Sequence, residues 1–140
     1  MAFMNLDAAA FIADEQLIRA LRRRSTPVDC SEDRVLFCQG EEPGGLYILH
    51  QGHAALTMCD EDGDVVLNMA ATPGSLLGLP GVVGNCPYSL SAAARQGSEV
   101  TFVSREQFAD LMLTEPNLAV MILQVLAAEV RTARIAACKG

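Results

Sequence analysis

The stretch Gly74-Ser75-Leu76-Leu77-Gly78-Leu79-Pro80-Gly81 decides the fold of this chain. Glycines and a proline interrupt a run of leucines, which indicates a short loop and turn. A second segment, Pro87-Tyr88-Ser89-Leu90-Ser91-Ala92, follows a few residues later. Together the two segments indicate a loop-and-turn unit set among β-strands.

Short apolar runs cut by Gly and Pro surround this unit. The turn Asp60-Glu61-Asp62-Gly63-Asp64 lies between two of them and contains the Asp-Gly pair typical of a hairpin. We expect about seven or eight short strands, a number that favours a roll, jelly roll or sandwich. The clearest candidates are residues 35–37, 46–49, 54–58, 65–69, 88–94 and 99–103.

Helical patterns occupy the two ends of the chain. The pattern of residues 7–24 predicts a helix with Asp7 as its N-cap. Thr26-Pro27 ends this helix. Ser104, with Gln107 three residues on, forms a capping-box pattern for a helix that reaches residue 114. A final helix is expected from residue 116 to 137, because Pro116 suits a first turn and no Gly or Pro follows inside.

This final helix is apolar on nearly every side. From residue 118 to 130, 11 of 13 residues are apolar, whereas a helix packed on one side of a domain has one apolar stripe. One apolar face of the helix can pack on the β-strands of its own chain. The other apolar face needs a partner, and we expect the same helix of a second copy to supply it in a homodimer. A fully buried core helix is the alternative interpretation. The expected seam residues are Leu118, Ile122, Val125, Glu129 and Thr132.

Composition excludes several classes of protein. The 51% apolar and 19% charged content fits a globular chain, and 140 residues suit one domain. A net charge of -7 argues against a general binder of nucleic acid or anionic membranes. The basic run Arg22-Arg23-Arg24 is interpreted as a solvated helix end. The longest apolar region is too short to span a bilayer and no signal pattern opens the chain, so we expect a cytoplasmic protein.

Metal and nucleophile patterns are weak. The five cysteines are scattered singly, which argues against a disulfide framework and against a zinc or iron–sulfur site. A cupin-like metal enzyme would need clustered ligands, but His50 and His53 are the only histidines and Gly52 lies between them. The acidic turn at residues 60–64 is interpreted as a hairpin, because a calcium loop counted from Asp60 would need Glu where Ala71 stands. We therefore expect no enzyme and no metal.

Three segments carry a resemblance to a known family. They are Leu36-Phe37-Cys38-Gln39-Gly40-Glu41, Leu46-Tyr47-Ile48-Leu49-His50-Gln51-Gly52 and Pro73-Gly74-Ser75-Leu76-Leu77-Gly78. In this order the chain resembles the cyclic-nucleotide-binding domain superfamily, specifically the sensor half of bacterial catabolite-activator and fumarate–nitrate regulators. The resemblance implies a mainly β α+β fold: an antiparallel, jelly-roll-like β-roll with an N-terminal helix and a long C-terminal dimerisation helix. Its parts are helical residues 1–26, a β-roll at 33–103 and C-terminal helices at 104–138.

The resemblance also implies a ligand site that has diverged. In relatives that bind cyclic nucleotides, a Glu of the phosphate-binding cassette accepts the ribose hydroxyl and an Arg pairs with the phosphate. Leu79 and Tyr88 stand at these positions here, although Ser89 survives beside the second. A buried phosphate without a cation is costly, so cyclic AMP and cyclic GMP are disfavoured and no cofactor is expected. Loop and helix amides leave true cyclic-nucleotide binding open as an alternative.

The expected pocket lies between the roll and the long helix. Its candidate residues are Leu77, Gly78, Leu79, Tyr88, Ser89 and Ser91 on the roll, with Gln124, Ala128 and Arg131 on the helix. A non-nucleotide effector and a collapsed, ligand-free roll are both compatible with these residues.

The sequence thus predicts a stand-alone, homodimeric, sensor-like regulatory domain without catalysis. Its expected partners are a second copy, a small-molecule effector or a related regulator. No helix-turn-helix follows the long helix, so binding of DNA by this chain itself is not expected. A truncated regulator whose output domain lies elsewhere is the remaining alternative.

Overall fold

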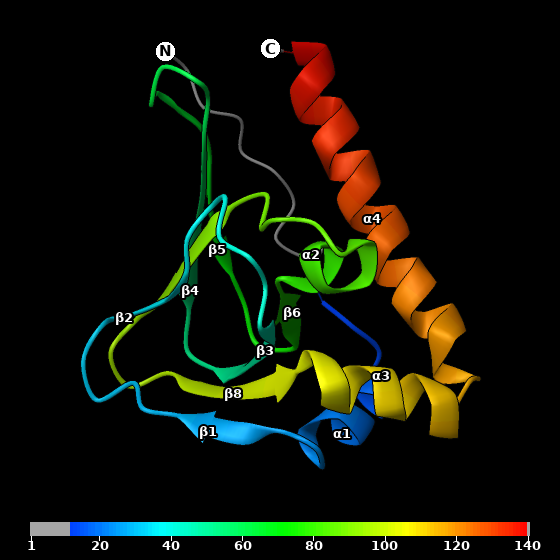
Figure 1. Cartoon of the computed structure of the whole chain (residues 1–140). Coiled ribbons are helices and arrows are strands. Elements are labelled where there is room, and N and C mark those ends of the chain that lie inside the picture. The colour runs from blue at the N-terminus through cyan, green and yellow to red at the C-terminus, as the bar shows by residue number, and fades with distance from the viewer. Residues whose placement is uncertain (1–11, 140) are drawn as a thin grey trace.

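Two antiparallel sheets and a set of helices form the molecule (Figure 1). The computed structural model describes the backbone of residues 12–139 and the side chains of residues 12–128. Within this range the elements are α1 (Glu15–Arg22), β1 (Thr26–Val28), β2 (Arg34–Phe37), β3 (Gly45–Gln51), β4 (Ala54–Cys59), β5 (Val65–Ala71), β6 (Ser75–Leu77), α2 (Leu79–Gly84), β7 (Ser91–Ala94), β8 (Glu99–Ser104), α3 (Arg105–Thr114) and α4 (Leu118–Lys139). The mainly β α+β fold is confirmed.

The strand orders are β1-β8-β3-β6 in one sheet and β2-β7-β4-β5 in the other. Side chains of both sheets, including Phe37, Leu49 and Leu56, form one buried cluster between them. The opposite face of the first sheet contributes Leu46 and Ile48 to a second cluster with all four helices. The first sheet is therefore covered on both faces, because neighbouring side chains on a strand point to opposite sides.

Glycines make three of the turns between strands. Gly40, Gly52 and Gly74 have φ angles of 90°, 91° and 94°, which favour glycine over any residue with a side chain. At Gly52 a Cβ would also lie 2.2 Å from the hydroxyl oxygen of Ser98. Both the positive φ and this steric clash therefore exclude any residue with a side chain from this position.

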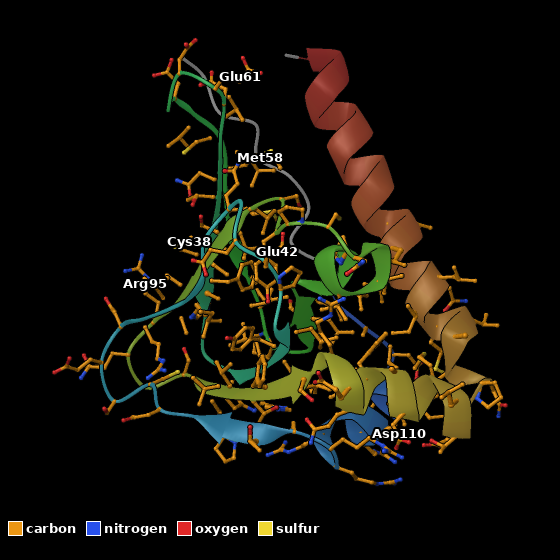
Figure 2. The ribbon with its side chains drawn as sticks, viewed as in Figure 1. Cys38, Glu42, Met58, Glu61, Arg95 and Asp110 are labelled. Carbon is orange, nitrogen blue, oxygen red and sulfur yellow. The ribbon has the colours of Figure 1, made fainter. Side chains whose placement is uncertain are left out.

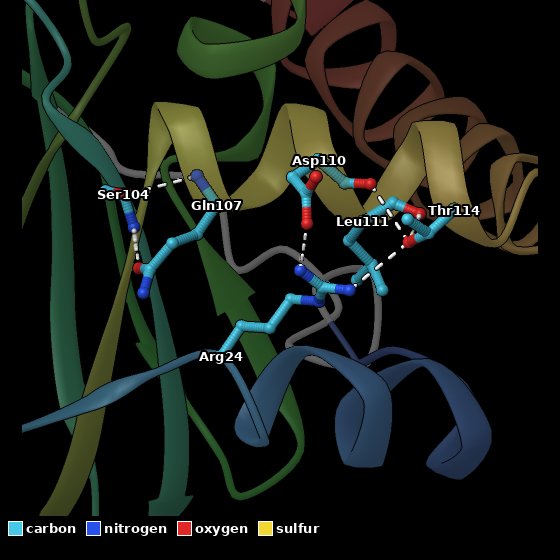
Figure 3. A network of polar contacts seen from close by, with 6 residues as sticks. All are labelled: Arg24, Ser104, Gln107, Asp110, Leu111 and Thr114. Atoms are coloured by element: carbon cyan, nitrogen blue, oxygen red, sulfur yellow. Dashed lines mark hydrogen bonds and ion pairs between the residues drawn. The ribbon is translucent and has the colours of Figure 1, made fainter.

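The capping box of α3 is confirmed (Figure 3). The Gln107 amide donates to Ser104 Oγ at 3.2 Å, and the Ser104 amide donates to Gln107 Oε1 at 3.1 Å. Two of the amide groups that a helix start leaves unpaired are thus satisfied.

The N-terminal helix begins later than predicted. Its N-cap is Asp14, whose carboxylate accepts a hydrogen bond from the Gln16 amide at 2.8 Å. Residues 7–11, including the predicted cap Asp7, lie outside the described residues. Just before the helix, Ile12 forms a β-bridge with Ser75. At Ile12, pairing with a sheet edge therefore takes the place of the expected helix.

Two strands differ from their predicted bounds. Strand β1 was missed because Pro27 lies inside it, but β1 pairs on one side only, with β8, where a missing amide is tolerated. Strand β7 begins at Ser91 instead of Tyr88. The Tyr88 amide and carbonyl bond instead to the loop before β3, at Glu41 and Gly40.

The basic run ends α1 as predicted, but two of its arginines are not merely solvated. Arg22 pairs with Glu99 of β8 at 2.5 Å. Arg24 pairs with Asp110 of α3 and donates to Thr114 Oγ1 at 3.2 Å (Figure 3). Exposed pairs contribute little stability each, so we infer that they mainly orient α1 against its neighbours.

A histidine lies beside the first of these pairs. His50 Nε2 is 2.8 Å from Thr101 Oγ1, and His50 Nδ1 is 3.4 Å from an Arg22 guanidinium nitrogen. Burial of the ring, and then the Arg22 charge, lower the pKa of His50, while Glu99 opposes them. The folded protein therefore favours the neutral ring.

This shift predicts a loss of stability in mild acid. The unfolded chain takes up a proton on His50 near pH 6.5. Because the folded pKa is lower, the contribution of His50 to the free energy of unfolding should be constant above that pH and fall as pH drops toward the folded pKa. Denaturant unfolding at pH 8, 6 and 5 measures this loss, which His50→Gln should reduce. Exposed His53→Gln is the control, and an equal acid loss in both variants would contradict the prediction.

Among the helices within residues 12–139, none is both long and apolar enough to cross a membrane.

Candidate functional site

The segment from β6 through α2 forms the turn predicted for the ligand cassette. Gly78 follows β6 with a φ of 88° and is the N-cap of α2, and Pro80 lies in the first turn of that helix. Asn85 ends the helix with a φ of 51°. The glycine-rich sequence thus becomes a six-residue helix between two left-handed residues.

The two leucines around Gly78 face different clusters. Leu77 is 1% exposed and packs between the sheets, whereas Leu79 is fully buried beneath the helices. Leu79 therefore lies away from Tyr88, which belongs to the cluster of Leu77. Sequence reasoning placed both leucines on one pocket wall, but the turn at Gly78 separates them.

Tyr88 is the central side chain of the site. It is 5% exposed, and its ring stacks on Phe37 with centroids 4.0 Å apart. Its hydroxyl donates to the Gly45 carbonyl at 2.5 Å. Phe37 in turn stacks on Tyr47, whose ring lies 5.0 Å from that of Phe102. A continuous row of aromatic rings thus begins at the cassette.

The Tyr88 ring lies directly against the cassette backbone. A Cβ at Gly78 would lie 2.8 Å from Tyr88 Cε1, and one at Gly81 would lie 3.4 Å from Tyr88 Cδ1. The ring therefore fills the space next to this turn. Burial raises the pKa of Tyr88, so the phenol stays neutral and offers no charge to an anion.

Arg105 supports the cassette from outside. Its guanidinium donates to the Pro43 carbonyl at 3.4 Å and to the Asn85 side chain, and its amide donates to the Gly44 carbonyl at 3.1 Å. These bonds hold the end of α2 against the loop before β3. Sequence reasoning missed Arg105, because no local pattern links it to Asn85, 20 positions earlier.

The other predicted pocket residues are dispersed. Ser89 is exposed, and Ser91 Oγ accepts a hydrogen bond from the Gln39 amide at 2.9 Å. On α4, Gln124 is exposed and Ala128 is half-buried, while the Arg131 side chain lies outside the described side chains. The structure brings Gly78 and Tyr88 into contact, and it leaves Ser89 and Gln124 facing solvent.

The face of α4 expected to form a dimer seam packs inside its own chain. Leu118, Ile122 and Val125 are 2%, 4% and 4% exposed and belong to the cluster beneath the helices. The assignment of these three residues to an outward face is therefore corrected, because the roll uses that face. Val120 and Leu123 are exposed instead, at 59% and 63%. The side chains of Glu129 and Thr132 lie outside those described.

Among the described residues, no group of three or more His, Cys, Asp and Glu side chains could hold a metal ion. His50 contacts Thr101 and Arg22, whereas His53 is exposed in the short connection between β3 and β4.

Comparisons with known proteins agree with this architecture. Residues 27–115 match the family model for the cyclic nucleotide-binding domain. The chain belongs to this family. A search among curated proteins found no match.

Solved structures share the fold at low sequence identity. The catabolite activator protein of Thermus thermophilus is 21% identical with a TM-score of 0.75, over 87% of this chain and 57% of that one. Oxidized CprK, in complex with o-chlorophenolacetic acid, is 19% identical with a TM-score of 0.72, over 92% and 53%. The c-di-GMP-responsive regulator CLP of Xanthomonas campestris is 18% identical with a TM-score of 0.71, over 90% and 62%. The chain therefore spans a little over half the length of these regulators.

The contact between Gly78 and Tyr88 predicts coupled effects of mutation. Gly78→Ala should cost about 1–2 kcal/mol from the left-handed backbone alone, plus the displacement of the Tyr88 ring. In a Tyr88→Ala background only the backbone cost should remain. Denaturant unfolding of both single variants and the double variant measures the coupling. Strictly additive free energies would show that the ring does not press on the turn.

Proposed function

We propose that this chain is a cytoplasmic, sensor-type regulatory domain, without catalysis, whose cassette is closed by its own Tyr88 in place of a cyclic nucleotide. The observation that carries the proposal is the buried Tyr88 ring, held by Phe37, by the Gly45 carbonyl and by the turn at Gly78. A ligand beside that turn would first have to displace this ring.

Electrostatics support the same conclusion. A cyclic phosphate needs a cation or several amides when it leaves water. At this cassette the Tyr88 hydroxyl already donates to Gly45, and Arg105 is held at the far end of α2 by Asn85 and Pro43. Helix α2 has six residues, so its N-terminal dipole is small. Binding through amides alone is thus the weaker alternative.

Aromatic effectors are a second candidate class. The row formed by Tyr88, Phe37 and Tyr47 offers stacking surfaces rather than charge. The relative CprK was solved with o-chlorophenolacetic acid, an aromatic molecule. An effector of this class would replace the Tyr88 ring on Phe37. The match covers only 57% and 62% of these two regulators, so we expect any output of this domain to be read through protein contacts or a separate output domain.

Calorimetric titration with cyclic AMP and cyclic GMP tests the closed cassette. We expect no binding heat from the wild-type protein with either nucleotide up to about 1 mM, a concentration that detects even weak sites. Tyr88→Arg, which removes the ring and supplies a cation, should create measurable binding, whereas Tyr88→Phe should stay silent. Micromolar binding by the wild type would overturn the proposal. An o-chlorophenolacetic acid titration tests the aromatic alternative.

We further propose that α4 mediates a homodimer through its outward face. Val120 and Leu123 lie three positions apart, which places them on one side of a helix. Both are more than half exposed, although apolar side chains gain from leaving water. A second copy of the same helix is the simplest cover for this stripe.

Two substitutions on α4 should behave differently. Leu123→Glu should halve the mass measured by light scattering and leave the fold intact, because the introduced carboxylate would be buried only in the interface with the second copy. Val125→Glu should instead unfold the protein, because Val125 is 4% exposed in its own core. Leu113→Glu, at a residue 83% exposed on α3, is the control. An unchanged mass for Leu123→Glu would rule out this seam.

A further inference from the structure

The two sheets leave four edge strands, and three have features that hinder pairing with another strand. Strand β1 contains Pro27, which has no amide hydrogen to donate. Strand β2 has four residues and begins with the charged Arg34. Strand β6 has three residues, and Ile12 bridges its Ser75.

Strand β5 is the exception. Its seven residues, Val65–Ala71, include no charged residue and no proline. Within the part of the chain that the structure describes, β5 pairs with β4 alone (Figure 1). Asn68 and Ala70 are exposed and Val66 is half-buried. A long, uncharged edge of this kind is a template for another strand.

The outer face of the sheet beside this edge carries small side chains. The strand registers place Val35, Ala93, Ala55 and Ala70 side by side across the four strands. A shallow groove of about 270 Å³ runs over this region, lined by His53, Ala54, Ala55, Asn68, Met69, Ala70 and Arg95. Small side chains leave room there for the side chain of an added strand.

We propose that β5 pairs antiparallel with β5 of a second copy, about a two-fold axis at Asn68. In this register Asn68 faces its own copy, and Val66 of each chain lies opposite Ala70 of the other. The larger Val66 side chain then enters the groove beside Ala70. Edge amides and carbonyls of both copies become paired, which joins two four-stranded sheets into one.

Charge complementarity favours a second copy as the occupant. The turn before β5 holds four acidic residues among positions 60–64. His53 and Arg95 lie at the other end of β5, because Ala54 pairs with Ala71 and the Arg95 amide bonds to the His53 carbonyl at 2.9 Å. The described residues offer neither of these two side chains a hydrogen bond or ion pair. Antiparallel pairing brings the acidic turn of each copy toward this basic end of the other.

This surface is separate from both the cassette and α4. Figure 2 shows Glu61, at the tip of the β4–β5 hairpin, projecting beyond the roll. The proposal therefore does not rest on the proposed function. With an α4 dimer as well, the two separate interfaces would join the wild-type protein into assemblies larger than a dimer at high concentration.

Analytical ultracentrifugation over a concentration series separates the two interfaces. In a Leu123→Glu background we expect a concentration-dependent dimer that Asn68→Lys abolishes, because two lysines would face each other at the axis. Val35→Lys, on the opposite edge of the same sheet face, should retain that dimer. A Leu123→Glu protein that stays monomeric at every concentration would overturn β5 pairing. If α4 is not an interface, Asn68→Lys alone should make the wild-type protein monomeric.

Oxidative cross-linking reads the register directly. Directly opposed residues of antiparallel strands have Cα atoms about 4.5–5.5 Å apart, within the range of a disulfide. Asn68→Cys should therefore yield a covalent dimer whose bond, mapped by mass spectrometry, joins the two introduced thiols. Val35→Cys and the wild type, which carries the native cysteines, are controls. Cross-links through native cysteines only, or none at all, would count against the register.

The charge contribution has its own test. In the Leu123→Glu background, Asp62→Lys should lower the affinity of the β5 dimer several-fold. Adding Arg95→Glu should restore much of that affinity. Failure of the second change to restore any affinity would overturn the placement of the acidic turn against Arg95.

Discussion

Every layer of the molecule depends on strand β3 being apolar on both faces. Leu46 and Ile48 point toward the helices, while Tyr47 and Leu49 point toward the second sheet. A strand that is apolar on both sides has to be covered twice. The second sheet supplies one cover and the four helices supply the other. The cassette between β6 and α2 then has a side chain in each layer, since Leu77 and Leu79 flank the turn at Gly78.

This double cover explains how the cassette and α4 are linked. Leu79 and Val82 of α2 share a buried cluster with Leu118 and Ile122 of α4. Any displacement of α2 would therefore change the packing of the first turns of α4. In the proposed closed state, Tyr88 holds the other side of the same turn through Gly78. In the proposed function, this linkage would carry the effect of a partner, or of an effector that displaces the ring, to α4.

The surfaces that remain uncovered also follow from the layers. The helices cover one sheet and leave the outer face of the other exposed, with β5 at its edge. On α4, packing of Ile122 and Val125 turns Val120 and Leu123 outward. Two copies that each carry a net charge of -7 repel each other. Association of two copies is therefore favoured at these apolar surfaces, where charge is locally absent or complementary.

The sequence by itself determined most of the strands, the glycine turns and the family, because each depends on local signals. It did not predict β1, where Pro27 lies inside the strand. Gly40 and Gly74 mark positive φ, Ser104 and Gln107 cap a helix, and alternating apolar residues mark strands. It also singled out Leu79 and Tyr88 as the two cassette positions to examine. Only the tertiary structure decided that the Tyr88 hydroxyl meets Gly45, 43 positions away, and which face of α4 the core uses. These outcomes depend on contacts between distant segments, and a helix that is apolar all round carries no local mark of the face that the roll will bury.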